Sequence, residues 1–411
     1  MANVLFLVHR MPYPPNKGDK VRSYHLLKHL AQRHRVFVGT FVDDPDDLQH
    51  LPALRALCAG LCAQTLNPRL AKLRSLAALA HGEPLTLRYY DNAALHAWVA
   101  ETVRSERIDA VLVFSSSMAP YAMRHPALPM LADLVDVDSA KWTDYAGNHA
   151  WPLSWLYRRE GERLLAYERE VVASARGSFL VTDKEVALFT GLAPESAGRV
   201  GALCNGVDAA FFAPDPQRPS PFAEGELPLV FTGAMDYWPN VDAVTWFAAE
   251  ALPALRRRWP ALRLHIVGRS PTADVQALAG DAVAVSGTVP DVRPYLQHAA
   301  VVVAPLRLAR GVQNKVLEAM AMARPVVAAQ TCVEAIDAQS GHDILPAVGA
   351  QDYVNAIDGL LADGQRADAV GQSGRRCVLA HYSWPARLAG LDDALSDLVP
   401  AAAPALQMES M

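Results

Sequence analysis

Short apolar runs alternate with longer segments of helical periodicity along almost the whole chain, and this alternation begins twice. The first series starts at 4–9 and ends near 200–203, and the second starts at 229–232 and ends near 326–329. Short buried strands separated by helices are typical of parallel sheets, because each parallel strand needs a crossover before the next one. The sequence therefore predicts an α/β chain made of two Rossmann-like, doubly wound domains.

A turn and a proline-rich connector separate the two series. The turn is Asn205-Gly206-Val207-Asp208, and the connector reads FFAPDPQRPSP. In open α/β sheets ligands bind beyond the carboxyl ends of the strands, so we expect the two domains to face each other across a cleft lined by their strand-end loops. The predicted boundaries are a first domain at 1–204, a linker at 205–225, a second domain at 226–383, a C-terminal helix at 384–400 that packs back toward the first domain, and a tail at 401–411.

Composition excludes several classes of protein. The chain has 411 residues, a length that favours two domains, and its formal net charge of −5 provides no overall positive field for binding nucleic acid. No two of its five cysteines have the two-residue spacing of a zinc knuckle, and an odd, scattered set does not suggest a disulfide framework. The start of the chain has neither the charged leader nor the cleavage site of a signal peptide, and no apolar run approaches the ~20 residues of a membrane span. We expect a cytoplasmic protein whose membrane contact, if any, is peripheral.

The stretch at 305–325, PLRLARGVQNKVLEAMAMARP, contains the most informative residues of the second half. A predicted strand ends just before it, Gly311 gives the following loop backbone freedom, and a helix is predicted to begin near Asn314. Lys315 and Glu318 are three residues apart, so they share one face of that helix.

These residues suit a nucleoside diphosphate. A helix N-terminus presents unpaired amides and partial positive charge, and Arg310 and Lys315 would add two cations for the phosphates. The carboxylate of Glu318, one turn deeper, could accept two ribose hydroxyls. The alternative is a solvated loop with a helical Lys–Glu pair, and the position at a strand end in a two-domain chain favours the nucleotide site.

The same stretch resembles the donor site of retaining glycosyltransferases of the GT-B fold, family 4, also called glycosyl transferases group 1. Glu318 followed by AMAMARPVV matches the second glutamate of that family's motif, and the resemblance extends over nearly the whole second domain and, more loosely, to GDKVRSYHLLKHLAQRH in the first. Within the family, the chain looks most like the sugar transferases that accompany PEP-CTERM/exosortase exopolysaccharide systems. The other matching motifs are LVFTGAMDYWPNVDAV, LRLHIVGR, VSGTVPDVRPYL, and the NGVD linker with its FF-x-P.

The resemblance implies a first domain that binds the acceptor and a second that binds the nucleotide-sugar donor. The resemblance places Arg310 at the position where the family has its first glutamate. This replacement leaves open which sugar is transferred and whether the chain is active. In the compensating interpretation, Arg310 and Lys315 form the phosphate-binding pair. The usual cations after the first strand of the second domain are absent, and Arg269 could supply one of them. The expected donor-binding residues are Glu318, Gly233, Arg269, Gly311, Val289 and Asn314.

Two groups in the first domain are candidates for acceptor binding or catalysis. In the loop after the first strand, Gly18 would permit close backbone approach, and Lys20 and Arg22 could hold an anionic group, although a solvated turn is an almost equal alternative. An acidic cluster follows the predicted strand at 130–135, and its carboxylates could bind acceptor hydroxyls or orient a nucleophile. The residues singled out from this cluster are Asp136 and Asp138 as catalytic groups and Lys141 as an acceptor contact. A metal-binding role for the two aspartates is the less favoured alternative, and no metal site is predicted.

Aromatic and basic residues of the first domain have the character of an interfacial surface, although core-facing aromatics with a solvated basic edge are at least as consistent with the pattern. The residues are Trp151, Trp155, Tyr157, Arg158 and Arg159, with Arg69, Lys72 and Arg74 among Leu70, Leu73 and Leu76. Lipid-linked acceptors would make such a surface useful.

The predicted activity is transfer of a sugar, of the hexosyltransferase type, from a nucleoside-diphosphate sugar to a glycan or lipid-linked glycan. The resemblance implies retention of configuration, catalysis by Arg310 and Lys315 without a metal or other cofactor, and a place in exopolysaccharide biosynthesis, at the cytoplasmic face of the inner membrane. Two alternatives stay open: a GT-B sugar-nucleotide epimerase, which needs no second substrate, and a non-catalytic partner in a glycan-assembly complex.

Overall fold

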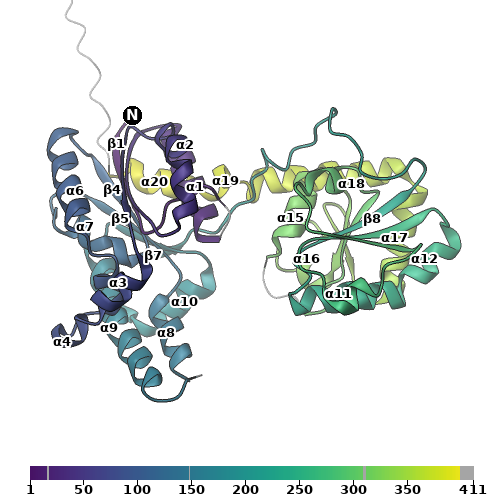
Figure 1. Cartoon of the computed structure of the whole chain (residues 1–411). Coiled ribbons are helices and arrows are strands. Elements are labelled where there is room, and N and C mark those ends of the chain that lie inside the picture. Colours follow the sequence, from purple (N-terminus) through teal and green to yellow (C-terminus); the bar gives the residue numbers. More distant parts are fainter. Residues whose placement is uncertain (16–17, 148, 309–311, 399–411) are drawn as a thin grey trace, which may run out of the picture. The chain divides into compact units, whose positions relative to one another are not determined.

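The computed structural model describes residues 1–15, 18–147, 149–308 and 312–398. This part of the chain divides into two compact units (Figure 1). Unit 1 comprises 1–205 together with the described chain from Arg387 onward, and unit 2 comprises 206–386.

Unit 1 is built on a parallel sheet of seven strands in the order β3-β2-β1-β4-β5-β6-β7. The central strands are continuous runs of buried apolar residues, as expected for a parallel sheet covered on both faces. Because β1 pairs with both β2 and β4, the strand order reverses between β1 and β4. The strands are β1 (Asn3–Val8), β2 (Arg35–Val42), β3 (Gly60–Thr65), β4 (Ala110–Phe114), β5 (Met130–Val135), β6 (Gly177–Leu180) and β7 (Val200–Ala202).

Helices connect these strands, and their apolar faces close the core of unit 1. They are α1 (Gly18–Ala31), η1 (Pro45–His50), α2 (Leu51–Arg55), α3 (Pro68–Ser75), α4 (Ala78–His81), α5 (Leu85–Tyr89), α6 (Ala93–Ser105), η2 (Ser116–Met118), α7 (Ala119–Met123), α8 (Asp138–Gly147), α9 (Leu153–Ser174), α10 (Asp183–Leu192), η3 (Pro194–Ser196) and, from the end of the chain, α20 (Ala389–Ser396).

Unit 2 repeats the design with a parallel sheet of six strands in the order β10-β9-β8-β11-β12-β13. Its order reverses between β8 and β11, in the same way as that of unit 1 between β1 and β4. The fold class predicted from the sequence, two Rossmann-like parallel-sheet domains, is confirmed. The strands are β8 (Leu227–Thr232), β9 (Leu262–Val267), β10 (Val283–Gly287), β11 (Val301–Ala304), β12 (Val326–Ala329) and β13 (Leu345–Ala347).

Helices lie on both faces of the sheet of unit 2, with α18 and α11 on opposite sides (Figure 1). The helices are α11 (Trp238–Glu250), α12 (Leu252–Arg258), α13 (Ala273–Gln276), α14 (Arg293–Gln297), α15 (Asn314–Ala321), α16 (Gln330–Val333), α17 (Ala350–Ala362) and α18 (Gly364–His381), and α19 (Trp384–Arg387) stands at the boundary between the units.

The segments predicted to connect or terminate the domains pack within the two units. Most of the segment expected as a linker, 205–225, lies in unit 2, where the amide of Asp215 donates to Gln297 over 2.9 Å. The end of the chain returns to unit 1, where Asp392 on α20 contacts the ring Nε2 of His29 at 2.9 Å. Within the described ranges, no helix combines the length and the apolar character needed to cross a membrane.

Candidate functional site

A cavity of about 410 Å³ lies at the carboxyl edge of the sheet of unit 2. Its walls come from the segments that follow β8, β9 and β10 and from α15, which follows β11. This is the point where the strand order reverses, and in open α/β sheets ligands bind at that point. The lining residues are Thr232, Gly233, Ala234, Val267, Gly268, Arg269, Thr288, Val289, Val292, Lys315 and Glu318.

Two glycines let the ends of β8 and β9 come together at the floor of the cavity. Gly233 has φ +156°, and a Cβ there would lie 2.7 Å from Nδ2 of Asn240 and 2.8 Å from Nζ of Lys315. A Cβ on Gly268, at φ +157°, would lie only 1.6 Å from the carbonyl oxygen of Gly233. A side chain on Gly268 would collide with the backbone of Gly233, whereas one on Gly233 would displace the side-chain ends of Asn240 and Lys315. Both glycines also have a backbone conformation that other residues rarely adopt.

Lys315 lies in the first turn of α15 and points its amine toward the end of β8. Its Nζ donates to Oδ1 of Asn240 over 2.6 Å and lies 4.3 Å from the centre of the Phe231 ring. Asn240 is oriented in turn by donating its Nδ2 to the carbonyl of Ala234 at 2.8 Å. Burial lowers the pKa of Lys315 to about 8, although Glu318 acts in the opposite direction. The lysine is therefore a fixed cation in a poorly solvated place, where it would interact strongly with an anion.

Glu318 lies one turn further along α15 and also lines the cavity. Burial raises the pKa of its carboxyl group to about 7, against the opposing effect of Lys315. No hydrogen bond to this carboxylate is formed by the residues that the structure describes. A partly buried carboxylate without such bonds is poised to accept hydroxyl groups from a ligand.

The remaining predicted donor residues fall in different places. Arg269 and Val289 line the cavity, and the Arg269 side chain is exposed. Asn314, the first residue of α15, is exposed and is not part of the lining. Arg310 and Gly311 lie outside the described residues.

Asn240 is a site residue that does not appear among those predicted from sequence. It follows Gly233 by seven residues and lies in the first turn of α11. The signal that could have identified it is the polar residue directly after Trp238-Pro239 at the start of a helix that leaves the strand end. Arg307, which stands near Arg310 in sequence, is directed elsewhere, because its Nε donates to Asp242 on α11 over 3.0 Å.

The predicted acceptor cations of unit 1 are internal, which differs from the expectation of an open cationic loop. Arg22 is 1% exposed and forms a bidentate pair with Asp133 on β5, with N–O distances of 2.8 and 3.0 Å, while its Nη1 donates to Asn205 over 2.9 Å. Lys20 is equally buried and pairs with Asp47. Both charges are compensated by carboxylates inside the protein, so neither side chain is available to an anionic acceptor. We therefore correct these two assignments and treat both residues as structural.

The expected acceptor role of Gly18 stays a prediction. This glycine is the first residue of α1, and a Cβ added there would have no atom within 4 Å. The packing of unit 1 therefore does not require glycine at this position.

The acidic cluster after β5 holds its own cation. Nζ of Lys141 donates to Asp136 at 2.7 Å and to Asp138 at 3.1 Å. Burial alone would lower the pKa of Lys141, but the two carboxylates raise it above its ordinary value. The structure thus brings these three predicted residues together at the carboxyl edge of the sheet in unit 1, with the ammonium as the counter-charge of the aspartates.

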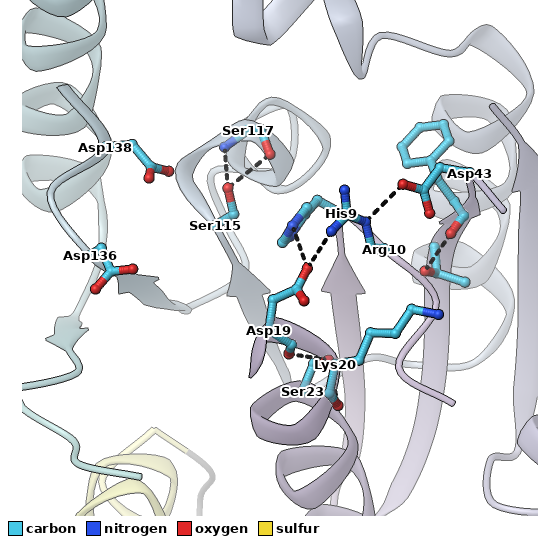
Figure 2. A network of polar contacts seen from close by, with 12 residues as sticks. His9, Arg10, Asp19, Lys20, Ser23, Asp43, Ser115, Ser117, Asp136 and Asp138 are labelled. Atoms are coloured by element: carbon cyan, nitrogen blue, oxygen red, sulfur yellow. Dashed lines mark hydrogen bonds and ion pairs between the residues drawn. The ribbon is translucent and has the colours of Figure 1, made fainter. Parts of the chain in front are cut away.

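A network of polar contacts surrounds the end of β1 (Figure 2). Arg10 donates to Asp19 and to Asp43, each over 2.8 Å, and Nε2 of His9 lies 3.7 Å from the same oxygen of Asp19. Against the opposing effect of burial, His9 and Arg10 hold the pKa of Asp19 well below its ordinary value. Asp19 therefore stays ionised and holds the side chains of His9 and Arg10 in place. Figure 2 shows Ser115, after β4, between this network and the carboxylates of Asp136 and Asp138.

The cavity of unit 2 lies in the part of the chain that is similar to a known protein family. Residues 226–363 match the family model described as glycosyl transferases group 1.

A curated relative matches a longer stretch. Over 213 residues the chain is 30% identical to the GDP-mannose-dependent alpha-(1-6)-phosphatidylinositol monomannoside mannosyltransferase of Mycolicibacterium smegmatis, covering 46% of this chain and 54% of that enzyme. The matched region thus spans about half the length of this relative.

Solved structures resemble the whole chain in fold. HepE of Anabaena, crystallised with UDP, has 15% identity and a TM-score of 0.60 over 96% of this chain and 100% of its own. Sucrose-phosphate synthase from Thermosynechococcus elongatus has 17% identity and a TM-score of 0.58 over 97% and 99%. WaaG, described as a glycosyltransferase involved in lipopolysaccharide biosynthesis, has 17% identity and a TM-score of 0.52 over 97% and 100%. These likenesses confirm the predicted GT-B fold.

Proposed function

We propose that this protein is a glycosyltransferase that takes a sugar from a nucleoside-diphosphate donor bound in the cavity of unit 2. The observation that carries the proposal is the placement of Lys315 and Glu318 in one cavity at the reversal point of the sheet, on a helix that begins there. A cationic helix N-terminus suits the diphosphate, and a carboxylate one turn deeper suits the ribose hydroxyls. The match of residues 226–363 to the family model of glycosyl transferases group 1 supports sugar transfer as the reaction class.

In the proposed reaction, the bond between the anomeric carbon and the diphosphate oxygen breaks through an oxocarbenium-like state. Negative charge grows on the departing diphosphate, and Lys315, the amides of α15 and Arg310 stabilise it. The acceptor hydroxyl forms the new bond to the anomeric carbon on the same face of the sugar, and its proton passes to the departing phosphate. Configuration is retained in this scheme, and fixed cations perform the charge stabilisation that a metal ion performs elsewhere.

The names of two similar proteins suggest two candidate bases for the donor nucleotide. The mycobacterial relative is named for GDP-mannose, and HepE was crystallised with UDP. We propose a hexosyl donor carried on one of these two nucleotides.

The acceptor in our proposal is a glycan or lipid-linked glycan in exopolysaccharide biosynthesis, of the kind associated with PEP-CTERM/exosortase systems. Such an acceptor would place the protein at the cytoplasmic face of the inner membrane, in peripheral contact with it.

Thermal unfolding with uridine, guanosine and adenosine diphosphates, each with and without magnesium, tests the donor site. At a nucleotide concentration one hundred times Kd, one of the nucleotides should add about 2.7 kcal/mol to the free energy of unfolding. For a unit of this size this corresponds to a rise of about 5–10 °C in melting temperature. The shift should not need magnesium and should vanish in Glu318→Ala. No shift with any nucleotide would favour a non-catalytic partner, and turnover of a nucleotide sugar without a second substrate would favour an epimerase.

Donor affinity should be greatest between about pH 7 and pH 8. Below the Glu318 pKa of about 7 the carboxylate becomes protonated and accepts hydroxyls poorly, and above the Lys315 pKa of about 8 the amine loses its charge. On the acid side the affinity should fall by up to about tenfold per pH unit, and on the alkaline side it should fall less, because Lys315 acts mainly on the charge that develops in the transition state. Calorimetric titration with a nucleoside-diphosphate sugar avoids the ionisation of a terminal phosphate. Glu318→Gln should flatten the acid side and Lys315→Arg the alkaline side, whereas a pH-independent affinity in the unaltered protein would contradict the assignment.

A further inference from the structure

The segment 67–82 of unit 1, which contains α3 and α4, presents its leucines to solvent and its small residues to the interior. Leu70, Leu73 and Leu76 are 59%, 66% and 46% exposed, and their spacing of three residues places them on one side of the segment. The buried positions hold Ala71, Ser75 and Ala78. A helix that only packs on a core buries its large apolar side chains, so this arrangement indicates that the leucines meet a further surface.

The same segment is cationic. It carries Arg69, Lys72 and Arg74 and no acidic residue, although the whole chain has a formal net charge of −5. Arg69 and Lys72 are exposed, and neither has a carboxylate partner among the residues that the structure describes. Exposed leucines that alternate with unpaired cations suit a partner that is both apolar and negatively charged.

The start of α9 adds aromatic side chains to this surface. α3 and α9 meet, since Leu76 and Leu153 line one cavity of about 650 Å³, and Arg159 donates to a backbone carbonyl of α4 over 3.1 Å (Figure 1). Trp151 and Trp155 are 80% and 54% exposed. These two tryptophans therefore do not face the core, which was the alternative interpretation of the aromatic and basic pattern.

We propose that these two segments form a docking surface for a bilayer that contains anionic phospholipids. The docking surface consists of Leu70, Leu73 and Trp155 with the exposed cations Arg69, Lys72 and Arg158. The apolar side chains enter the boundary between head groups and acyl chains, where tryptophan is favoured, and the cations lie at the lipid phosphates.

Charge complementarity selects this partner. A neutral bilayer or an uncharged protein would leave the cations without a counter-charge, and an acidic polymer would leave the leucines and tryptophans in water. The inference rests on the proposed function for the membrane contact, to which it assigns residues and a lipid class, but on no step of the transfer reaction.

Sedimentation of the full chain with lipid vesicles, without nucleotide, tests the inference. Binding to vesicles of equimolar phosphatidylglycerol and phosphatidylcholine should be at least tenfold stronger than binding to phosphatidylcholine alone, because each cation near an anionic surface contributes about fivefold. This preference should decline as salt is added, since salt screens exposed charges.

Matched variants locate the binding. Arg69→Gln should weaken binding to the anionic vesicles about fivefold, whereas Arg257→Gln, at an exposed arginine of α12 in unit 2, should not. Leu73→Ser should weaken it about tenfold, whereas Leu188→Ser, at a leucine of α10 that is 42% exposed, should not. All four positions are exposed, so unchanged melting temperatures should show that the variants fold.

The sign of the charge effect has its own check. Glu162 is exposed on α9, one turn beyond Arg158. Glu162→Gln removes a negative charge beside the docking surface, so it should strengthen binding to the anionic vesicles and leave binding to phosphatidylcholine unchanged.

Three results would overturn the inference: no binding to the anionic vesicles, equal binding to both kinds of vesicle, or binding that neither Arg69→Gln nor Leu73→Ser changes. Self-association that Leu73→Ser abolishes, without vesicle binding, would assign the surface to a second copy of this chain. Nucleotide-induced stabilisation, measured on the same samples, separates the two claims. If nucleotide stabilises the protein and vesicles do not bind, only the docking inference fails, whereas the reverse result contradicts the proposed transferase.

Discussion

Replacing Lys315 by methionine should slow sugar transfer by about 10²–10³-fold, a typical effect of removing one preorganised group that stabilises charge in a transition state. The lysine amine is held by Asn240 at 2.6 Å in a poorly solvated place, and charge on the diphosphate increases as the anomeric bond breaks. Donor binding should weaken much less than turnover. Steady-state release of nucleoside diphosphate from the donor, with the acceptor saturating, measures both quantities.

Glu318→Gln is the matched comparison for this prediction. Because the ribose hydroxyls remain bound throughout the reaction, loss of the carboxylate should raise KM more than it lowers kcat. Lys315→Met and Glu318→Gln should therefore separate into a variant that mainly loses kcat and one that mainly loses donor affinity. Equal, small effects of both on kcat and KM would contradict the roles assigned to them.

Replacing Arg22 by methionine should destabilise the protein by about 3–5 kcal/mol, the usual consequence of leaving one member of a buried ion pair uncompensated. Asp133 is fully buried, and Arg22 provides its bidentate partner. The pair joins α1 to β5, and Arg22 also reaches Asn205 beyond β7, so three parts of unit 1 depend on it. Urea unfolding followed by circular dichroism measures the loss.

Two controls make this prediction specific. Arg104→Met removes an exposed ion pair with Glu101 on α6 and should cost at most about 1 kcal/mol. The double variant Arg22→Met with Asp133→Leu removes both charges and should recover much of the stability. A single variant as stable as the original protein would show that the pair is not structural.

Much of the fold follows from sequence periodicity. Runs such as 110–114 and 301–304 are short, apolar and flanked by helical segments, which is sufficient to predict parallel strands and crossovers. The start of α15 and the common face of Lys315 and Glu318 are also local properties, so the sequence predicts them directly.

The surroundings of a charged residue are harder to predict, because they depend on partners far along the chain. Lys20 and Arg22 look like cations of an open loop, yet both lie on α1, and the partner of Arg22 is 111 residues away on β5. Asn240 shows the same limit, since its contact with Lys315 spans 75 residues. A cavity of about 650 Å³ in unit 1 likewise joins helices α3, α5, α8 and α9, which are separate in sequence, so its lining cannot be identified before the fold is known.

A crystal structure with the nucleoside diphosphate that stabilises the protein most would test the central claim directly. The account predicts the diphosphate within hydrogen-bond distance of Nζ of Lys315 and of the first amides of α15, with the ribose hydroxyls on the carboxylate of Glu318. A nucleotide bound elsewhere, or an empty cavity at a concentration that raises the melting temperature, would contradict it.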